Sequence, residues 1–106
     1  MKFERQAIPD VILVTPDRHG DARGFFSETF RANVYEEAGI AGPFVQDNHA
    51  YSAEAGVLRG LHFQAPPKAQ AKLVRCARGA VLDVAVDIRR SSPTFGQHVS
   101  AELSEQ

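Results

Sequence analysis

Two side chains near the middle of the sequence, His62 and Lys72, could together carry acid–base chemistry. Imidazole is the one side chain that ordinarily changes its charge near neutral pH, so a placed histidine can accept a proton from a substrate. Lys72 leads an apolar face in residues 70–76, which alternate as a strand does. Such a lysine lies either at a solvent rim or in a pocket, where its ammonium group could stabilise negative charge.

Arg59 precedes His62 by three residues, and Gly60 stands between them. In a regular strand the two side chains would point to opposite faces. A glycine permits a bulge or kink that could turn both into one cavity. The plainer interpretation is a structural histidine and a solvated lysine, because ordinary hydrogen-bond networks also use these residues. Residue types alone therefore support no more than a small β domain.

Composition excludes several classes of function. The chain has 106 residues, the size of a single domain, with 12 basic and 13 acidic side chains and a net charge of −1. The basic residues form no cluster, so we expect no nucleic-acid partner. The N-terminus lacks the long apolar run of a signal peptide or membrane span. The single cysteine, Cys76, is expected to be a small buried apolar group in a reducing compartment, and we expect a cytoplasmic protein.

Turn signals divide the chain into short segments. Residues 31–38 form the one good helical window, which Gly39 and then Gly42-Pro43 end. Residues 17–24 have the composition of a loop. Strands are expected at 11–14, 25–30, 44–51, 57–63, 71–77, 80–88 and 95–103. Many short strands separated by turns are typical of an all-β sandwich or barrel.

Four blocks in order resemble the dTDP-4-dehydrorhamnose 3,5-epimerase family. They are DARGFFSETF (21–30), FVQDNHAYS (44–52), GVLRGLHFQAPPKAQAKLVR (56–75) and GAVLDVAVDIRRSSPTFGQ (79–97). The resemblance implies a double-stranded β-helix, the cupin-like jelly roll, with one short helix and an incomplete barrel in this chain. Residues 1–106 would be the N-terminal portion of a single epimerase domain. The resemblance also implies a homodimer that exchanges N-terminal strands.

The family acts on a dTDP-4-keto-6-deoxy sugar, inverting C3 and C5 through an enolate without cofactor or metal. By position, His62 matches the base, Lys72 the group that stabilises charge on the C4 oxygen, and Arg59 a residue near the sugar and phosphates. We expect His62 and Lys72 to share a dry cavity. The remaining substrate-contact residues implied by the resemblance are Arg23, Phe26, Glu28, Gln46, Asp47 and Asn48.

The family's tyrosine acid and the aspartate that orients the histidine match no residue here, so we expect the intact protein to be longer. Neither Tyr35 nor Tyr51 matches the acid, and Asp83 and Asp87 do not match the aspartate. A chain of 106 residues alone would be inactive and would expose apolar sheet edges. The alternatives are a truncated, non-catalytic sugar-nucleotide-binding domain and a metal-dependent cupin. The latter usually needs paired histidines and a glutamate, which the sequence lacks after His62.

Overall fold

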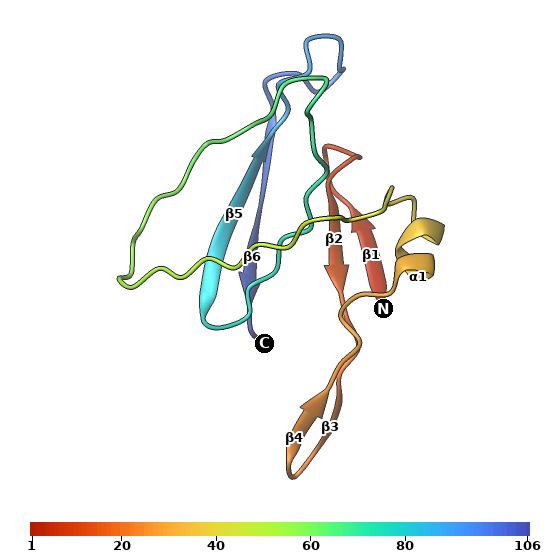
Figure 1. Ribbon diagram of the computed structural model, residues 1–106, viewed down its shortest axis with the longest axis vertical. Coiled ribbons are helices and arrows are strands. Elements are labelled where there is room, and N and C mark those ends of the chain that lie inside the picture. The colour runs from red at the N-terminus through yellow and green to blue at the C-terminus, as the bar shows by residue number, and fades with distance from the viewer.

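The computed structural model describes residues 1–106 and contains three two-stranded antiparallel sheets and one helix (Figure 1). Each sheet is formed by two strands that are consecutive in the sequence. The pairs are β1 (Lys2–Arg5) with β2 (Ile12–Thr15), β3 (His19–Asp21) with β4 (Gly24–Phe26), and β5 (Ala80–Val86) with β6 (His98–Ser104). Helix α1 spans Ala32–Glu37, which confirms the helical prediction to within one residue at each end.

The small apolar core lies where α1 packs against the first hairpin. Tyr35 of α1 is only 3% exposed, and its ring meets Phe3 of β1 and Phe30 edge to face, at centroid distances of 5.4 and 4.8 Å. Phe30 also contacts Phe44, at 5.9 Å. Ile8, in the β1–β2 turn, is the other buried apolar residue. Gly39 ends the helix at φ +85°, the left-handed conformation that favours glycine there.

The second hairpin corrects two predictions. Residues 17–24 were expected to form a loop, but His19–Asp21 pairs with Gly24–Phe26. The carboxylate of Asp21 accepts a hydrogen bond from the backbone N–H of Arg23 at 2.8 Å, which closes the tight turn. The strand expected at 25–30 ends at Phe26 because its partner strand is only three residues long.

The third hairpin confirms the two C-terminal strand predictions. Strands β5 and β6 pair over seven residues, from Ala80 opposite Ser104 to Val86 opposite His98. The alternation of β6 leaves Val99, Ala101 and Leu103 half-buried between exposed polar neighbours, as expected of a strand with one apolar face.

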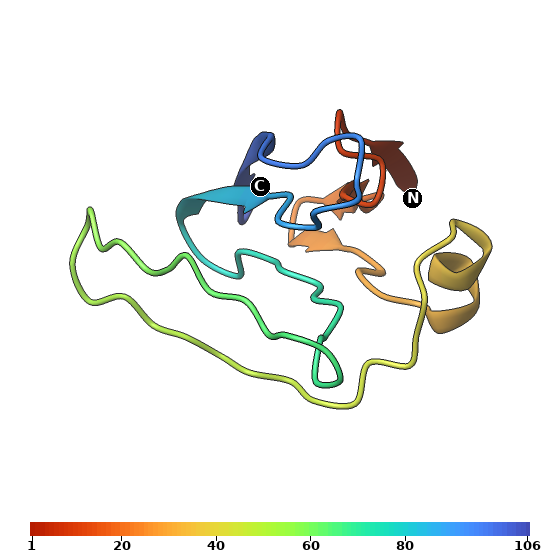
Figure 2. The same ribbon diagram turned by 90° about the horizontal axis from the view of Figure 1, so that it is seen from above.

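The strands expected at 44–51, 57–63 and 71–77 are absent. Residues 41–79 form no helix or strand, and the only backbone hydrogen bond within 41–78 runs from Lys68 N–H to the carbonyl of Ala65. A strand exists only beside a hydrogen-bonded neighbour, and no other segment of this chain pairs with these residues. Figures 1 and 2 show that this segment, which connects α1 to β5, forms a long loop extending away from the sheets.

The chain is more open than a closed domain of its length. Its radius of gyration is 15.3 Å, whereas a compact chain of this size has about 13 Å. Only Ile8, Tyr35 and Asp87 are buried, and apolar side chains such as Leu58 are almost fully exposed. The prediction of a mostly β chain with one short helix and no closed barrel is therefore confirmed. At six residues, the helix is far too short to cross a bilayer.

Candidate functional site

His62 and Lys72 both lie in the irregular segment 41–79, and both are exposed. Gly60 has φ +108°, and a Cβ atom added to it would stand 3.4 Å from Nδ1 of His62. The backbone at Gly60 therefore departs from the extended conformation, as a kink would require, and the imidazole lies close to this glycine. The expected dry cavity is not formed by this chain alone, because no covering element lies over the two side chains. Both side chains are therefore open to water in this structure.

Arg59 is oriented by the residues that precede it. Its Nε and Nη2 both donate to Oγ of Ser52 at 3.2 Å, and Nη2 also donates to the carbonyl of Tyr51 at 3.1 Å. These bonds engage one side of the guanidinium and leave Nη1 without a protein partner. An arginine held in this way can offer its remaining donors to an anionic ligand.

The residues proposed for nucleotide contact begin on the second hairpin. Arg23 lies at the turn of β3 and β4, and its Nη2 pairs with Oδ2 of Asp21 at 2.6 Å. The guanidinium holds the pKa of the Asp21 carboxyl below its ordinary value. Phe26 is 75% exposed, and Glu28 is also exposed. A diphosphate that bound Arg23 would therefore compete with Asp21, while the Phe26 ring is open to stack on a base.

The second predicted contact segment is also exposed. Nε2 of Gln46 donates to Oδ1 of Asn48 at 3.3 Å, so these two amides lie on the same side of the chain. Asp47 stands between them and is exposed without a hydrogen-bond or ion-pair partner. No hydrogen bond joins this segment to the nucleotide-contact residues of the second hairpin. The chain brings Gln46 and Asn48 together but leaves them open to solvent.

Two neighbours of the candidate residues were not anticipated from the sequence. The guanidinium carbon of Arg18 lies 4.1 Å above the centroid of the Phe25 ring, a cation–π contact beside Phe26. Arg75 donates from Nη1 to Oγ1 of Thr29 at 2.9 Å. The Arg18–Phe25 contact depends on the pairing of β3 with β4, where a loop was expected, and the Arg75–Thr29 bond joins residues 46 positions apart.

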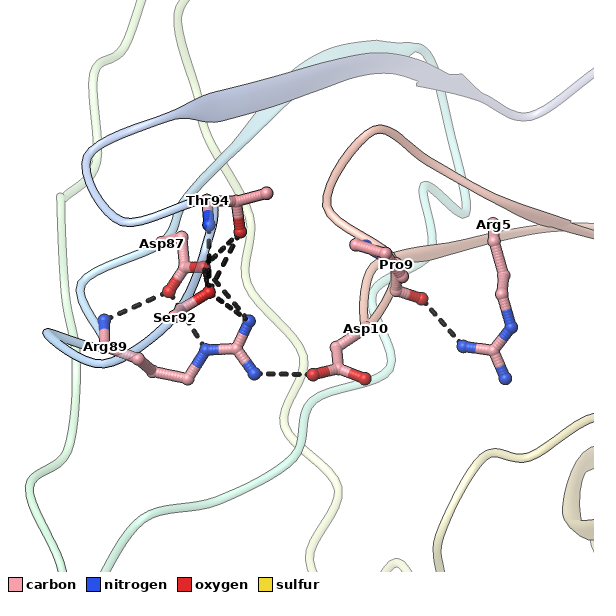
Figure 3. A network of polar contacts seen from close by, with 7 residues as sticks. All are labelled: Arg5, Pro9, Asp10, Asp87, Arg89, Ser92 and Thr94. Atoms are coloured by element: carbon pink, nitrogen blue, oxygen red, sulfur yellow. Dashed lines mark hydrogen bonds and ion pairs between the residues drawn. The ribbon is translucent and has the colours of Figure 1, made fainter.

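The one buried charge belongs to a network at the far end of β5 (Figure 3). The Asp87 carboxylate accepts hydrogen bonds from Arg89 Nε at 2.9 Å and Arg89 N–H at 3.0 Å, and from the hydroxyls of Ser92 and Thr94. Arg89 first, and then the two hydroxyls, hold the pKa of Asp87 far below its ordinary value. Arg89 also pairs with Asp10 in the first hairpin. With its oxygens occupied, Asp87 has a structural role.

The geometry of the remaining candidates corrects one more prediction. Cys76 is half-exposed rather than buried, and its thiol donates to the carbonyl of Arg78 at 3.3 Å.

An open hollow of about 280 Å³ beside the Asp87 network is lined by Asp10, Arg89 and Ser92 among others, and not by His62 or Lys72. No group of three histidine, cysteine, aspartate or glutamate side chains could hold a metal ion.

Sequence comparisons identify close relatives along the whole chain. The family model of dTDP-4-dehydrorhamnose 3,5-epimerase matches residues 5–106. The enzyme of that name from Shigella flexneri is 56% identical over 107 residues, covering 100% of this chain and 59% of the relative. The one from Pseudomonas aeruginosa is 58% identical, with 100% and 58% covered. The chain thus spans somewhat more than half the length of these relatives.

Solved structures agree with the sequence comparisons. A dTDP-4-dehydrorhamnose 3,5-epimerase from Bacillus anthracis, with TDP and PPi bound, matches with a TM-score of 0.94 and 49% identity over 98% of this chain and 59% of that one. A 3,5-epimerase from Legionella pneumophila in complex with dTDP-4-keto-L-rhamnose matches with a TM-score of 0.91 and 50% identity, covering 98% and 55%. The segment 41–79 thus follows the path of these enzymes although it lacks strand partners here.

These likenesses confirm the predicted fold class, a cupin-like jelly roll of which this chain supplies an incomplete barrel. The block that carries Arg59, His62 and Lys72 lies inside the matched range. The chain belongs to the dTDP-4-dehydrorhamnose 3,5-epimerase family and corresponds to the N-terminal part of its members.

Proposed function

We propose that this chain is the N-terminal portion of a single cupin-like domain that epimerises C3 and C5 of a dTDP-4-keto-6-deoxy sugar. The observation that carries the proposal is the match to the Legionella pneumophila enzyme, whose crystal structure contains dTDP-4-keto-L-rhamnose, at 50% identity. The reaction would serve the synthesis of dTDP-L-rhamnose or a related deoxysugar.

In the proposed reaction, His62 removes the proton from C3 or C5. The electron pair of the broken C–H bond moves into an enolate whose oxygen is that of the C4 ketone. The Lys72 ammonium group stabilises this oxygen, and such stabilisation is worth about 10²–10³-fold in rate per donor. An acid then returns a proton to the opposite face of the carbon. Proton transfer of this kind requires no cofactor.

The nucleotide would be bound by side chains that this chain presents to solvent. Arg59 keeps Nη1 available for a phosphate oxygen, and Phe26 offers an open ring to the thymine or sugar. Arg23 and Glu28 would contact the same nucleotide, and the second segment, Gln46, Asp47 and Asn48, would contact the substrate from another side. Because these residues are exposed here, a complete site needs a cover, which we propose includes a second copy exchanging N-terminal strands.

Proton exchange with solvent tests the proposed reaction directly. The intact protein, of which we propose that this chain is the N-terminal part, is incubated in D₂O with dTDP-4-keto-6-deoxy-D-glucose, and the substrate is followed by NMR. We expect deuterium at C3 and C5, since each carbon passes through an enolate. A protein that binds the sugar nucleotide but leaves both carbons protonated would refute the reaction.

The exposure of His62 and Lys72 favours one second candidate, a non-catalytic sugar-nucleotide-binding domain. A binder needs the arginines and the aromatic ring but no base. The same incubation separates the two functions, because a binder retains affinity for dTDP without deuterium incorporation.

A further inference from the structure

A single hydrogen bond links the long irregular segment to the first part of the chain. Among the hydrogen bonds of residues 41–78, only that from Arg75 Nη1 to Oγ1 of Thr29, at 2.9 Å, reaches a residue outside the segment. The two residues are 46 positions apart. The rings of Phe30 and Phe44 form a second contact between the segment and the first part of the chain. Arg75 and Thr29 therefore connect this segment to the first part of the chain, whereas Gly79 at its end bonds to Glu105 beside the third hairpin.

Thr29 is a fixed point to which Arg75 can bind. Its carbonyl accepts a hydrogen bond from the phenol of Tyr35 at 2.7 Å, and the Tyr35 ring is held by Phe3 and Phe30 in the small core. Burial raises the pKa of the Tyr35 phenol, so it remains a donor across the neutral range. Thr29 is thus restrained through its backbone by Tyr35 and through its side chain by Arg75.

The hydrogen bond between Arg75 and Thr29 joins the nucleotide-contact block to the segment that carries Lys72. Thr29 directly follows Glu28 in the nucleotide-contact block, and Arg75 stands three residues after Lys72. We propose that Arg75 is a positioning residue: its bond to Thr29 sets the place of the Lys72 ammonium group relative to the bound nucleotide. This inference rests on the proposed epimerase function.

The chemistry of the pair suits this role. Arg75 forms no ion pair, and its side chain makes its only hydrogen bond to a neutral hydroxyl. Such a bond gives direction at modest strength, so its loss should move Lys72 without unfolding the chain. A displacement of about 1 Å at a reacting group can slow a reaction by as much as 10²-fold.

A mutant cycle on the full protein tests the proposal. Thr29→Val removes the hydroxyl at similar volume, Thr29→Ser keeps it, and Arg75→Gln shortens the donor at an exposed position. We expect Thr29→Val and Arg75→Gln each to lower kcat for deuterium exchange about ten-fold, with KM within about two-fold. The double variant should be no slower than either single variant, since both remove one interaction. Thr29→Ser should retain nearly full activity.

Thermal denaturation and TDP affinity of every variant provide the structural control. Losses that multiply in the double variant, an unchanged kcat in Thr29→Val, or a loss that simply follows a fall in Tm would each overturn the positioning role. If the unmutated protein incorporates no deuterium, the proposed function itself fails and this inference falls with it. Exchange in the unmutated protein and equally in Thr29→Val would overturn only the positioning role.

Discussion

Removing the Tyr35 side chain should destabilise the fold more than any other single truncation near α1. Tyr35 is 3% exposed, contacts two aromatic rings and donates to the carbonyl of Thr29 at 2.7 Å. Truncation of a large buried aromatic residue to alanine costs about 3–5 kcal/mol. The hydrogen bond alone contributes about 1 kcal/mol, so Tyr35→Phe should lose about that amount. Because native proteins are stable by only about 5–15 kcal/mol, Tyr35→Ala should remove a large share of the free energy of unfolding.

Urea denaturation followed by far-UV circular dichroism measures these losses as free energies of unfolding. The matched control is Tyr51→Ala, because Tyr51 is 79% exposed and should change stability by less than about 0.5 kcal/mol. A cost below about 1 kcal/mol for Tyr35→Ala, or equal costs for Tyr35→Ala and Tyr51→Ala, would refute the view that this aromatic group is the core.

Three further predictions concern the kink, the buried charge and the ammonium group. Gly60→Ala should slow proton exchange more than Gly56→Ala: both glycines have positive φ, but only at Gly60 does an added Cβ approach His62. Equal effects would point to backbone strain alone. The pKa of Asp87 is depressed, so Asp87 stabilises the fold above about pH 4 and loses this contribution as the pH falls further. Asp87→Asn should therefore lower Tm at pH 7 and flatten its decline below pH ~4; an unchanged acid limb would contradict this. Lys72→Ala should lower kcat at least about 10²-fold with little change in TDP affinity by calorimetry, and an intact kcat would remove Lys72 from the mechanism.

Local elements could be predicted from the sequence because their signals are local. The helix followed from residues 31–38 and the glycine that ends it, and β5 and β6 followed from short runs bounded by turn signals. The strands expected at 44–51, 57–63 and 71–77 have the right composition, but a strand also needs a neighbour to accept its hydrogen bonds. Alternation in one segment cannot show whether such a neighbour is present.

In the candidate site, too, local features could be predicted from the sequence and contacts between distant residues could not. The sequence suggested that Gly60 permits a break in the alternation between Arg59 and His62, and Gly60 does adopt a positive φ, which an extended strand would not have. The bond from Arg75 to Thr29 could not be predicted, since it joins residues 46 positions apart through the packing of Tyr35. The exposure of His62 also could not be predicted, because burial depends on what covers a residue rather than on its own sequence.

Solvent exchange in a histidine variant tests the central claim, that His62 is the base. In the intact protein, His62→Ala and the matched variant His98→Ala are compared in D₂O with dTDP-4-keto-6-deoxy-D-glucose, and TDP affinity is measured for both by calorimetry. His98 is an exposed histidine on β6, outside the proposed site. We predict that His62→Ala incorporates no deuterium at C3 or C5 while binding TDP normally, and that His98→Ala resembles the unmutated protein. Undiminished exchange in His62→Ala would contradict the account.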